Sequence, residues 1–340
     1  MRQIWIPKAG PPEVLQLRDA LDPLPGQGEL RIRVEAVGVN FADIMGRLGL
    51  YPDLPRMPVV PGYEVAGRID AVGEGMEVDW IGRDVLAATR FGGYADVVCV
   101  SEHQVFVRPP EMTAAEGAAL PVNYLTAYLL IEVMGGLSSG ESVLIHSAGG
   151  GVGIAAIQLA RRIGARIIGT ASSGKHDFLK SIGVDHCIDY TQEDFEQRVR
   201  ELTQGTGVEL VIDAVGGTSF KKSFRALAPT GRMGMFGVSS SVTGKQRSRL
   251  ASLRTALSMP WLQFNPLVLI NQNKGVFGVN LGRLWEEADR LSAWMEVLLQ
   301  YYRRSVIRPV ISEKFPFTEA ADAHHYIQDR KNIGKVLLLP

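Results

Sequence analysis

The sequence has few cysteines, no net charge and no long apolar stretch, and each absence excludes a class of protein. Two cysteines among 340 residues, Cys99 and Cys187, cannot form a disulfide framework and fit a reducing compartment. A formal net charge of zero gives no indication of a nucleic-acid partner. No apolar run is long enough for a membrane-spanning helix, and the first residues lack the apolar core of a signal peptide. We therefore expect a cytoplasmic protein without an integral membrane segment.

What the sequence does contain is a strand, a glycine turn and a helix in succession at residues 143–163. A short apolar run breaks into a glycine-rich turn, and apolar residues then recur with helical spacing. The turn carries Ala148, Gly150 and Gly153 at the key positions of a dinucleotide-binding fingerprint, with alanine in place of the first glycine. Backbone without Cβ atoms lets N–H groups at a helix start approach a pyrophosphate. We expect cofactor contacts from Ala148, Gly150, Gly151 and Val152.

Strand and helix patterns alternate through the middle of the chain. This alternation predicts an α/β fold with a doubly wound parallel sheet and right-handed crossovers. The ligand should then lie at the carboxyl ends of the strands. Beyond the first strand, the predicted strands are 166–170, 208–213 and 232–236, and the predicted helices are 175–182, 194–202 and 219–227.

In the first part of the chain the sequence instead predicts many short strands separated by glycine and proline. This pattern favours a mainly β, partly barrel-like domain. Its predicted strands are 30–36, 65–72, 85–88, 94–98 and 105–107. Near the C-terminus we expect helices at 286–302 and 319–328 and strands at 307–311 and 334–339.

The residues after the second strand of the α/β part indicate which dinucleotide binds. An NAD site places an Asp or Glu about 20 residues after the glycine turn, to accept hydrogen bonds from the ribose hydroxyls. Residues 170–175 contain no acid; they offer Thr170, Ser172 and the cation of Lys175. Hydroxyls and a lysine accommodate a 2′-phosphate, so the predicted cofactor is NADPH. The alternative for Lys175 is a solvated lysine at a helix start.

Several clusters resemble the medium-chain dehydrogenase/reductase superfamily, in particular its zinc-free quinone oxidoreductase branch and, within it, the vesicle amine transport protein subfamily. The resemblance covers essentially the whole chain. It implies a GroES-like partial barrel at 1–123 and 283–340, and a Rossmann domain at 124–282 with an inserted segment at about 239–274. The clusters that carry it are 40–43, 49–51, 120–128 and 332–337.

The same resemblance implies further cofactor contacts and an assembly. Tyr190 would join Lys175 around the 2′-phosphate, and Thr126 would lie near the nicotinamide carboxamide. Segments 236–237 and 277–280 would lie beside the nicotinamide ring; the residues concerned are Phe236, Gly237, Phe277, Val279 and Asn280. An apolar strand at 276–279 on the edge of the sheet is expected to be covered, and a homodimer formed through that edge would cover it.

The first domain lacks the zinc ligands of the alcohol dehydrogenases that share this layout. Asn40 and Tyr63 stand where those enzymes place Cys and His, and Asn and Tyr are poor zinc ligands. Glu64 by itself is not a metal site, so we expect no metal. Tyr63 is interpreted as filling the space of the missing zinc.

Without a Lewis acid, alcohol oxidation is hard, whereas reduction of an electrophilic acceptor needs mainly positioning and hydrogen-bond donors. The sequence therefore predicts an NADPH-dependent reductase of a quinone or an α,β-unsaturated carbonyl compound. Asn40 would donate to the substrate carbonyl and the Tyr51 hydroxyl would orient or protonate it. Alternatively, Asn40 caps the helix that follows it, and Tyr51 is an aromatic residue of a surface loop.

Two further features leave alternatives open. His146 lies inside a predicted buried strand and is interpreted as a core histidine rather than a base. The insert combines basic residues with an apolar run, which fits a lid, a dimer contact or a membrane-surface element. The insert also supports an alternative function, namely an NADPH-binding scaffold with a membrane- or partner-binding role and little turnover.

Overall fold

The computed structural model describes residues 1–242, 257 and 264–340 and divides them into two compact units. The first unit contains Met1–Leu125 and Leu281–Pro340, so two distant parts of the chain build it. The second contains residues 126–242 and 264–280. Most of the predicted insert at 239–274 therefore lies outside the described residues, and its role stays a prediction.

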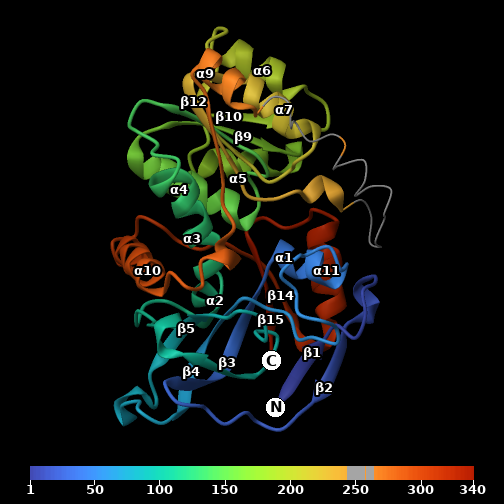
Figure 1. The fold of residues 1–340 in the computed structure, drawn as a ribbon, viewed down its shortest axis with the longest axis vertical. Coiled ribbons are helices and arrows are strands. Elements are labelled where there is room, and N and C mark those ends of the chain that lie inside the picture. Colours follow the sequence, from blue (N-terminus) through green and yellow to red (C-terminus); the bar gives the residue numbers. More distant parts are fainter. Residues whose placement is uncertain (243–256, 258–263) are drawn as a thin grey trace. The chain divides into compact units, whose positions relative to one another are not determined.

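The second unit is built on a six-stranded, fully parallel sheet in the order β10-β9-β8-β11-β12-β13. The strand order changes direction between β8 and β11, which is the switch point where ligands bind in such sheets. Figure 1 shows the helices of this unit packed around the sheet. The strands are β8 (Ser142–Ile145), β9 (Arg166–Ala171), β10 (His186–Asp189), β11 (Val208–Asp213), β12 (Leu227–Met235) and β13 (Gly275–Gly278).

Helix α4 (Gly151–Ile163) follows β8 directly and shows why the predicted pattern folds this way. Its apolar residues recur on one face and are buried, and Gly164 ends the helix in the left-handed conformation with φ of 84°. The other helices of this unit are α5 (His176–Ser181), α6 (Phe195–Leu202), α7 (Thr218–Arg225) and α9 (Pro266–Gln272), with the short helices η4 (Leu129–Val133), η5 (Ser173–Lys175) and η6 (Ser239–Ser241).

The first unit contains a seven-stranded sheet that runs β14-β15-β3-β4-β5-β7, with β6 also paired to β3, and a separate β1–β2 hairpin. Its strands are β1 (Arg2–Trp5), β2 (Gln16–Asp19), β3 (Glu29–Val39), β4 (Glu64–Val72), β5 (Asp84–Ala88), β6 (Val97–Ser101), β7 (Val105–Val107), β14 (Ile311–Pro316) and β15 (Lys335–Leu339). Its helices are α1 (Phe41–Arg47), α2 (Ala114–Gly117), α10 (Ala288–Arg303) and α11 (Ala320–Gln328), with the short turns η1 (Pro12–Val14), η2 (Val78–Trp80), η3 (Glu102–Gln104), η7 (Leu281–Arg283) and η8 (Phe317–Glu319). Helix α3 (Pro121–Tyr128) carries the chain from this unit into the second.

The C-terminal segment completes the sheet of the first unit, as predicted. Strand β15 pairs antiparallel with β3, and Leu338 lies opposite Val37. The apolar side chains of β15 and of α11 are buried in one core cluster with residues of β3, β4 and β5. The fold of the first unit therefore needs residues that are about 300 positions apart in sequence.

Several predicted elements are shifted or were missed. Residues 94–96 precede β6 instead of forming its start, because Ala95 forms only an isolated bridge with Gln3. The predicted strand at 307–311 is wrong: β14 begins at Ile311 and runs to Pro316. Helix α3 begins at Pro121 and continues as the π-helical turn η4. Strand β10 and the β1–β2 hairpin were not predicted, since polar residues interrupt these short strands and leave no apolar run.

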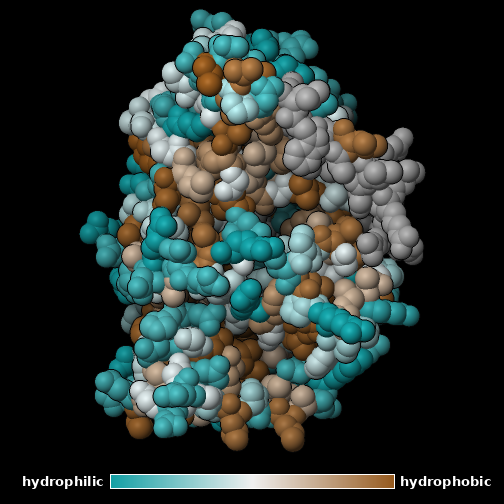
Figure 2. Space-filling model, in the orientation of Figure 1, coloured by the Kyte–Doolittle hydropathy of each residue, from teal (hydrophilic) through white to brown (hydrophobic). Residues whose placement is uncertain are grey.

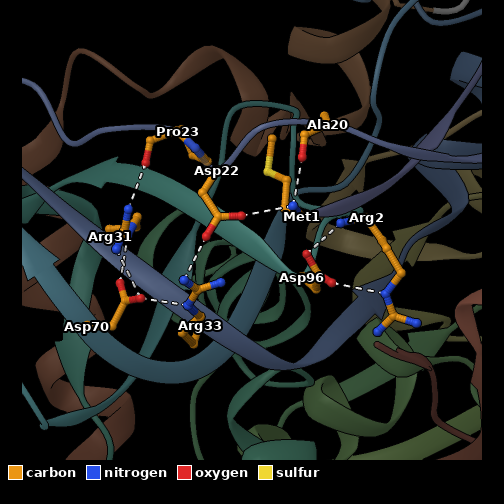
Figure 3. Close-up of polar contacts among 9 residues, drawn as sticks. All are labelled: Met1, Arg2, Ala20, Asp22, Pro23, Arg31, Arg33, Asp70 and Asp96. Atoms are coloured by element: carbon orange, nitrogen blue, oxygen red, sulfur yellow. Dashed lines mark hydrogen bonds and ion pairs between the residues drawn. The ribbon is translucent and has the colours of Figure 1, made fainter.

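Charged residues link strands β3 and β4 on the exterior of the first unit (Figure 3). The Asp70 carboxylate accepts hydrogen bonds from the guanidinium groups of Arg31 and Arg33, at 2.8 and 2.6 Å for the shorter contacts. Arg33 also pairs with Asp22, which accepts a hydrogen bond from the amino group of Met1. These partly exposed pairs contribute little individually and together join the segment after β2 to the sheet.

Candidate functional site

The glycine turn lies at the carboxyl edge of the parallel sheet, between β8 and α4. Gly150 is the N-cap residue of α4, no side chain caps it, and Gly151 and Val152 form the first turn of the helix. The buried Ala148 donates its N–H to the carbonyl oxygen of Thr170 at 3.1 Å, which ties the turn to the neighbouring strand. A Cβ on Gly153 would stand 2.5 Å from the Ser147 carbonyl oxygen, so only glycine fits there.

Lys175 lies against this glycine turn, although it follows a different strand. A Cβ on Gly149 would stand 2.8 Å from Cδ and 3.7 Å from Nζ of Lys175, so the lysine side chain crosses directly over the turn. Ser172 is the N-cap residue of η5, and its carbonyl oxygen accepts the Lys175 N–H at 3.0 Å. The structure thus brings a cation to the predicted phosphate-binding turn.

Asp189 at the end of β10 orders the two segments predicted to surround the 2′-phosphate. Its carboxylate accepts the backbone N–H of Ser173 at 3.2 Å, and the backbone N–H and hydroxyl of Thr191 at 2.9 and 2.6 Å. The hydrogen bond from the Thr191 hydroxyl is the main reason that the pKa of Asp189 is lowered. Tyr190 stands between these contacts and is 39% exposed.

Thr170, a predicted cofactor contact, directs its hydroxyl into the core. Its Oγ1 lies 3.1 Å from His146 Nδ1, and His146 Nε2 lies 3.0 Å from the Ser223 hydroxyl, which donates to Asp213 at 2.7 Å. Because the Asp213 carboxylate only accepts, His146 Nε2 carries the proton and Nδ1 accepts from Thr170. Burial lowers the pKa of His146, partly opposed by Asp213, so the neutral ring is favoured. His146 is therefore a core histidine, as predicted.

The remaining predicted cofactor residues of the second unit follow β12 and β13 or lie in α3. Phe236 donates its N–H to Asp213 at 3.1 Å, and Gly237 packs against Ala214. The Phe277 ring covers Gly234, and the buried Val279 donates its N–H to the Met235 carbonyl oxygen at 2.9 Å. The ends of β12 and β13, with Asn280 after Val279, come to the same carboxyl edge as the glycine turn, because all six strands are parallel. Thr126 is buried in α3.

In the first unit, a buried polar cluster surrounds Asn40, which occupies the N-cap position of α1. The Asn40 amide nitrogen donates to Glu64 at 2.9 Å and to the Gly38 carbonyl oxygen at 3.4 Å. Its oxygen accepts from the Lys335 ammonium at 2.6 Å, and Lys335 also pairs with Glu64. Glu64 and Lys335 are 0% and 3% exposed, so this ion pair is almost fully removed from water.

Both hydrogens of the Asn40 amide are engaged within the protein. The contact of Asn40 with a substrate carbonyl stays a prediction. Sequence reasoning treated Glu64 only as an insufficient metal ligand and gave Lys335 no role. The sequence does contain a signal for this ion pair: strands β4 and β15 each begin with a charged residue. Such residues need partners if the strand ends are buried.

Asp43 connects this cluster to the Pro-Gly turn before β4. Its carboxylate accepts the backbone N–H of Asn40 at 2.8 Å and that of Gly62 at 2.9 Å. Complete burial raises the pKa of Asp43 to about 7, and the hydrogen bond from Asn40 and the charge of Lys335 act in the opposite direction. Asp43 is a buried anchor of the helix start rather than an exposed acid.

Next to this cluster lie three aromatic side chains from separate loops. The rings of Tyr51 and Tyr63 are 6.0 Å apart in an edge-on arrangement, and Phe91 lies 5.3 Å from Tyr63. Tyr51 is half-buried, while Tyr63 is buried, as expected for a residue that fills space. Burial raises the pKa of both phenols. The described residues contain no group of three or more His, Cys, Asp or Glu side chains that could hold a metal ion.

Two protein families match this chain. The alcohol dehydrogenase GroES-like domain matches residues 26–110, and the zinc-binding dehydrogenase family matches residues 151–296. The synaptic vesicle membrane protein VAT-1 homolog of Rattus norvegicus is 43% identical over 96% of this chain and 80% of its own length. The chain belongs to the medium-chain dehydrogenase/reductase superfamily.

Other members of this superfamily match end to end. A quinone oxidoreductase of Pseudomonas aeruginosa is 33% identical over 100% of this chain and 99% of its own length. The solved structure of the Escherichia coli quinone oxidoreductase complexed with NADPH has a TM-score of 0.88 at 29% identity and covers 100% of both chains. A mycobacterial protein complexed with NADPH has a TM-score of 0.87 at 32% identity, also over 100% of both chains. The predicted Rossmann and GroES-like architecture is thereby confirmed.

The residues at the carboxyl edge of the second unit fit a phosphorylated dinucleotide. An uncapped helix start offers N–H groups and a partial positive charge to a pyrophosphate. Lys175 adds a full positive charge beside the same turn, and residues 170–175, which follow from β9, contain no carboxylate that would repel a 2′-phosphate. None of the helices in the described part of the chain is both long and apolar enough to cross a membrane.

Proposed function

We propose that this protein is a zinc-independent NADPH-dependent oxidoreductase that reduces a quinone or an α,β-unsaturated carbonyl compound. The cofactor is NADPH. The observation that carries the proposal is the Lys175 side chain, which lies across the phosphate-binding turn. Residues 170–175, at the end of β9 and just after it, contain no Asp or Glu. Relatives named quinone oxidoreductase, one of them solved with NADPH, support the choice of acceptor.

The second unit holds the cofactor. Ala148, Gly150, Gly151 and Val152 would bind the pyrophosphate through backbone groups. The segments Ser172–Lys175 and Tyr190 would surround the 2′-phosphate, and Phe236–Gly237 and Phe277–Asn280, with Thr126, would hold the nicotinamide ring. When bound, NADPH supplies a hydride to the electrophilic carbon of the acceptor.

The first unit supplies the proton. The Tyr51 hydroxyl donates to the acceptor oxygen and then transfers its proton as negative charge develops there. Burial is the main cause that raises the pKa of Tyr51, so the phenol is fully protonated at neutral pH. Asn40 does not touch the acceptor in this proposal; its contacts with Glu64 and Lys335 fix the start of α1.

The choice of acceptor follows from these groups. A quinone or enone is already electrophilic, so it needs orientation and one good hydrogen-bond donor. Oxidation of a simple alcohol would need an alkoxide to be stabilised, and Lys335, the cation beside Asn40, is already paired with Glu64.

The test is NADPH oxidation across a panel of quinones and enones, followed by its absorbance. Tyr51→Phe should lower kcat by 10²–10⁴-fold, the contribution of general acid catalysis. Tyr326→Phe, which removes a hydroxyl from a tyrosine packed against Phe315, is the matched control and should leave kcat unchanged. Absence of turnover with every acceptor, despite tight binding of NADPH, would refute the reductase function.

That negative outcome would support a second candidate, an NADPH-binding scaffold with a membrane- or partner-binding role. The relatives named synaptic vesicle membrane proteins favour it. So do Leu267 and Ile270 of α9, which are 72% and 69% exposed. On the face drawn in Figure 2, however, hydrophobic side chains are interspersed with hydrophilic ones. Binding to liposomes, measured by co-sedimentation, separates the two functions.

We also propose a homodimer formed through β13 and a cytoplasmic location. β13 is the last strand of the parallel sheet, and its outer edge pairs with no other strand of the described chain. Sedimentation of the wild-type protein and of Val276→Pro tests this assembly, since proline interrupts strand pairing at an edge. A monomeric wild-type protein would refute it.

A further inference from the structure

Tyr63 carries a buried hydroxyl for which the described structure provides no hydrogen-bond partner. The residue is 7% exposed, and its Oη forms no hydrogen bond of standard geometry. Buried hydroxyl groups nearly always have a partner, because leaving one unmet is costly. A buried Tyr63 hydroxyl without a hydrogen-bond partner, beside a proposed catalytic residue, therefore calls for a functional explanation.

Tyr51 is the phenol beside this hydroxyl. The Tyr63 ring meets the Tyr51 ring edge-on, with centroids 6.0 Å apart, and on the other side it meets Phe91. Phe91 has a φ of 83°, a left-handed conformation that a non-glycine residue rarely adopts. Such strain is kept where the surroundings fix the backbone, and it is found often at functional sites. The Tyr63 ring thus packs against both the Tyr51 ring and the ring of Phe91.

The two phenols also interact electrostatically, and the interaction has a direction. Burial raises the pKa of Tyr51 most, the Asp53 carboxylate raises it further, and the neighbouring Tyr63 hydroxyl lowers it. For Tyr63, burial is again the largest cause, and Asp43, Tyr51 and Asp53 all raise its pKa. Tyr63 therefore keeps its proton, and its buried hydroxyl, which has no partner in the described structure, is available to donate to Tyr51.

We propose that Tyr63 is a positioning residue for Tyr51, whose oxygen receives a hydrogen bond from the Tyr63 hydroxyl as Tyr51 gives up its proton. This inference rests on the proposed function, in which Tyr51 is the proton donor. In the resting protein the Tyr63 hydroxyl has no partner of standard geometry. The hydrogen bond forms when charge appears on the Tyr51 oxygen, because charge-assisted hydrogen bonds are shorter and stronger.

The proton balance of the step is simple. NADPH provides the hydride, with both electrons, and leaves as NADP⁺. The O–H bond of Tyr51 breaks and a new O–H bond forms on the acceptor oxygen. Tyr51 is left as a phenolate, which takes a proton back from water. Tyr63 keeps its own proton throughout and only stabilises the charge.

The charged groups around Tyr51 must be controlled in any test. Asp43 and Asp53 raise the pKa of Tyr51, and Arg283 lowers it. Arg283 is itself paired with Asp53, at 2.9 Å between Nε and Oδ2. A pH profile therefore has to compare variants that leave these three residues unchanged.

The experiment compares Tyr63→Phe, which removes only the hydroxyl, with Phe91→Leu, which changes the packing on the other side of the ring. The Tyr51 pKa is measured directly by NMR with ¹³C-labelled tyrosine, and its signal is assigned by its loss in Tyr51→Phe. Tyr63→Phe should raise the Tyr51 pKa and lower kcat by about tenfold with little change in KM. In the Tyr51→Phe background it should have no further effect, since the two residues act as one unit. Phe91→Leu should leave the Tyr51 pKa unchanged.

Each result has a separate meaning. An unchanged Tyr51 pKa in Tyr63→Phe, with the same NADPH affinity and thermal stability as the wild type, overturns the inference even if the enzyme is a reductase. The same holds if Tyr63→Phe lowers kcat equally with and without Tyr51. If Tyr51→Phe retains full turnover, the proposed proton donor fails, whereas the NMR titration still reports whether Tyr63 donates to Tyr51.

Discussion

The contribution of Lys175 to the choice of cofactor is the most direct prediction from the structure. Its side chain lies across Gly149, and no carboxylate occurs within residues 170–175. A hydrogen bond between a lysine and a phosphate involves charged groups and contributes about 1.5–3 kcal/mol. Lys175→Ala should therefore raise the Kd for NADPH by about 10- to 150-fold. The Kd for NADH should stay nearly unchanged, because NADH lacks the 2′-phosphate.

Titration of each cofactor by fluorescence measures both constants without any acceptor. Lys180→Ala is the matched control: Lys180 is an exposed lysine of the helix that follows, so its loss removes one positive charge away from the turn. If the NADPH-to-NADH preference of Lys175→Ala equals that of the wild type, Lys175 is only a solvated surface residue. An equal loss in Lys180→Ala would instead attribute the effect to overall charge.

Three further predictions test other parts of the site. Gly149→Ala should weaken NADPH selectively without loss of thermal stability, because the new Cβ would displace Lys175; an unchanged Kd would contradict the packing seen here. Lys335→Met should lower the free energy of unfolding in urea by about 3–5 kcal/mol, because it leaves Glu64 buried and unpaired, and adding Glu64→Gln should recover part of the loss. The pKa of Asp43 is raised to about 7 in the folded protein, so the folded state binds this proton more tightly than the unfolded chain does. Protonated Asp43 therefore contributes stability that is lost as the pH rises from 4 to 7. Unfolding midpoints across that range should fall less steeply in Asp43→Asn, and identical slopes would refute the raised pKa.

The sequence predicted the second unit well because its signals are local. A glycine turn between an apolar strand and an amphipathic helix specifies its own geometry, and α4 begins where the pattern places it. The missing acid after β9 is equally local, since it needs only a fixed distance from the turn. Strand β10 was missed because its first and last residues, His186 and Asp189, are polar and leave no apolar run. Its end nevertheless places Asp189 and Tyr190 beside the turn after β9.

The first unit was harder to predict, because its contacts join distant residues. Nothing near Asn40 in the sequence indicates that its amide will meet Lys335, since the two residues are 295 positions apart. That partnership ties Asn40, at the start of α1, to the C-terminal strand β15. The unmet hydroxyl of Tyr63 is likewise a tertiary property, as it depends on which side chains surround the ring.

The sequence alone thus determined the superfamily, the cofactor turn and the absence of Cys and His ligands at residues 40 and 63, because each depends on residue identity or short spacing. Only the tertiary structure decided which polar side chains are already engaged. It assigns the Thr170 hydroxyl to His146 and the Asn40 amide to Glu64. A buried polar group must be hydrogen-bonded, and its partners come from whichever strands the sheet brings together.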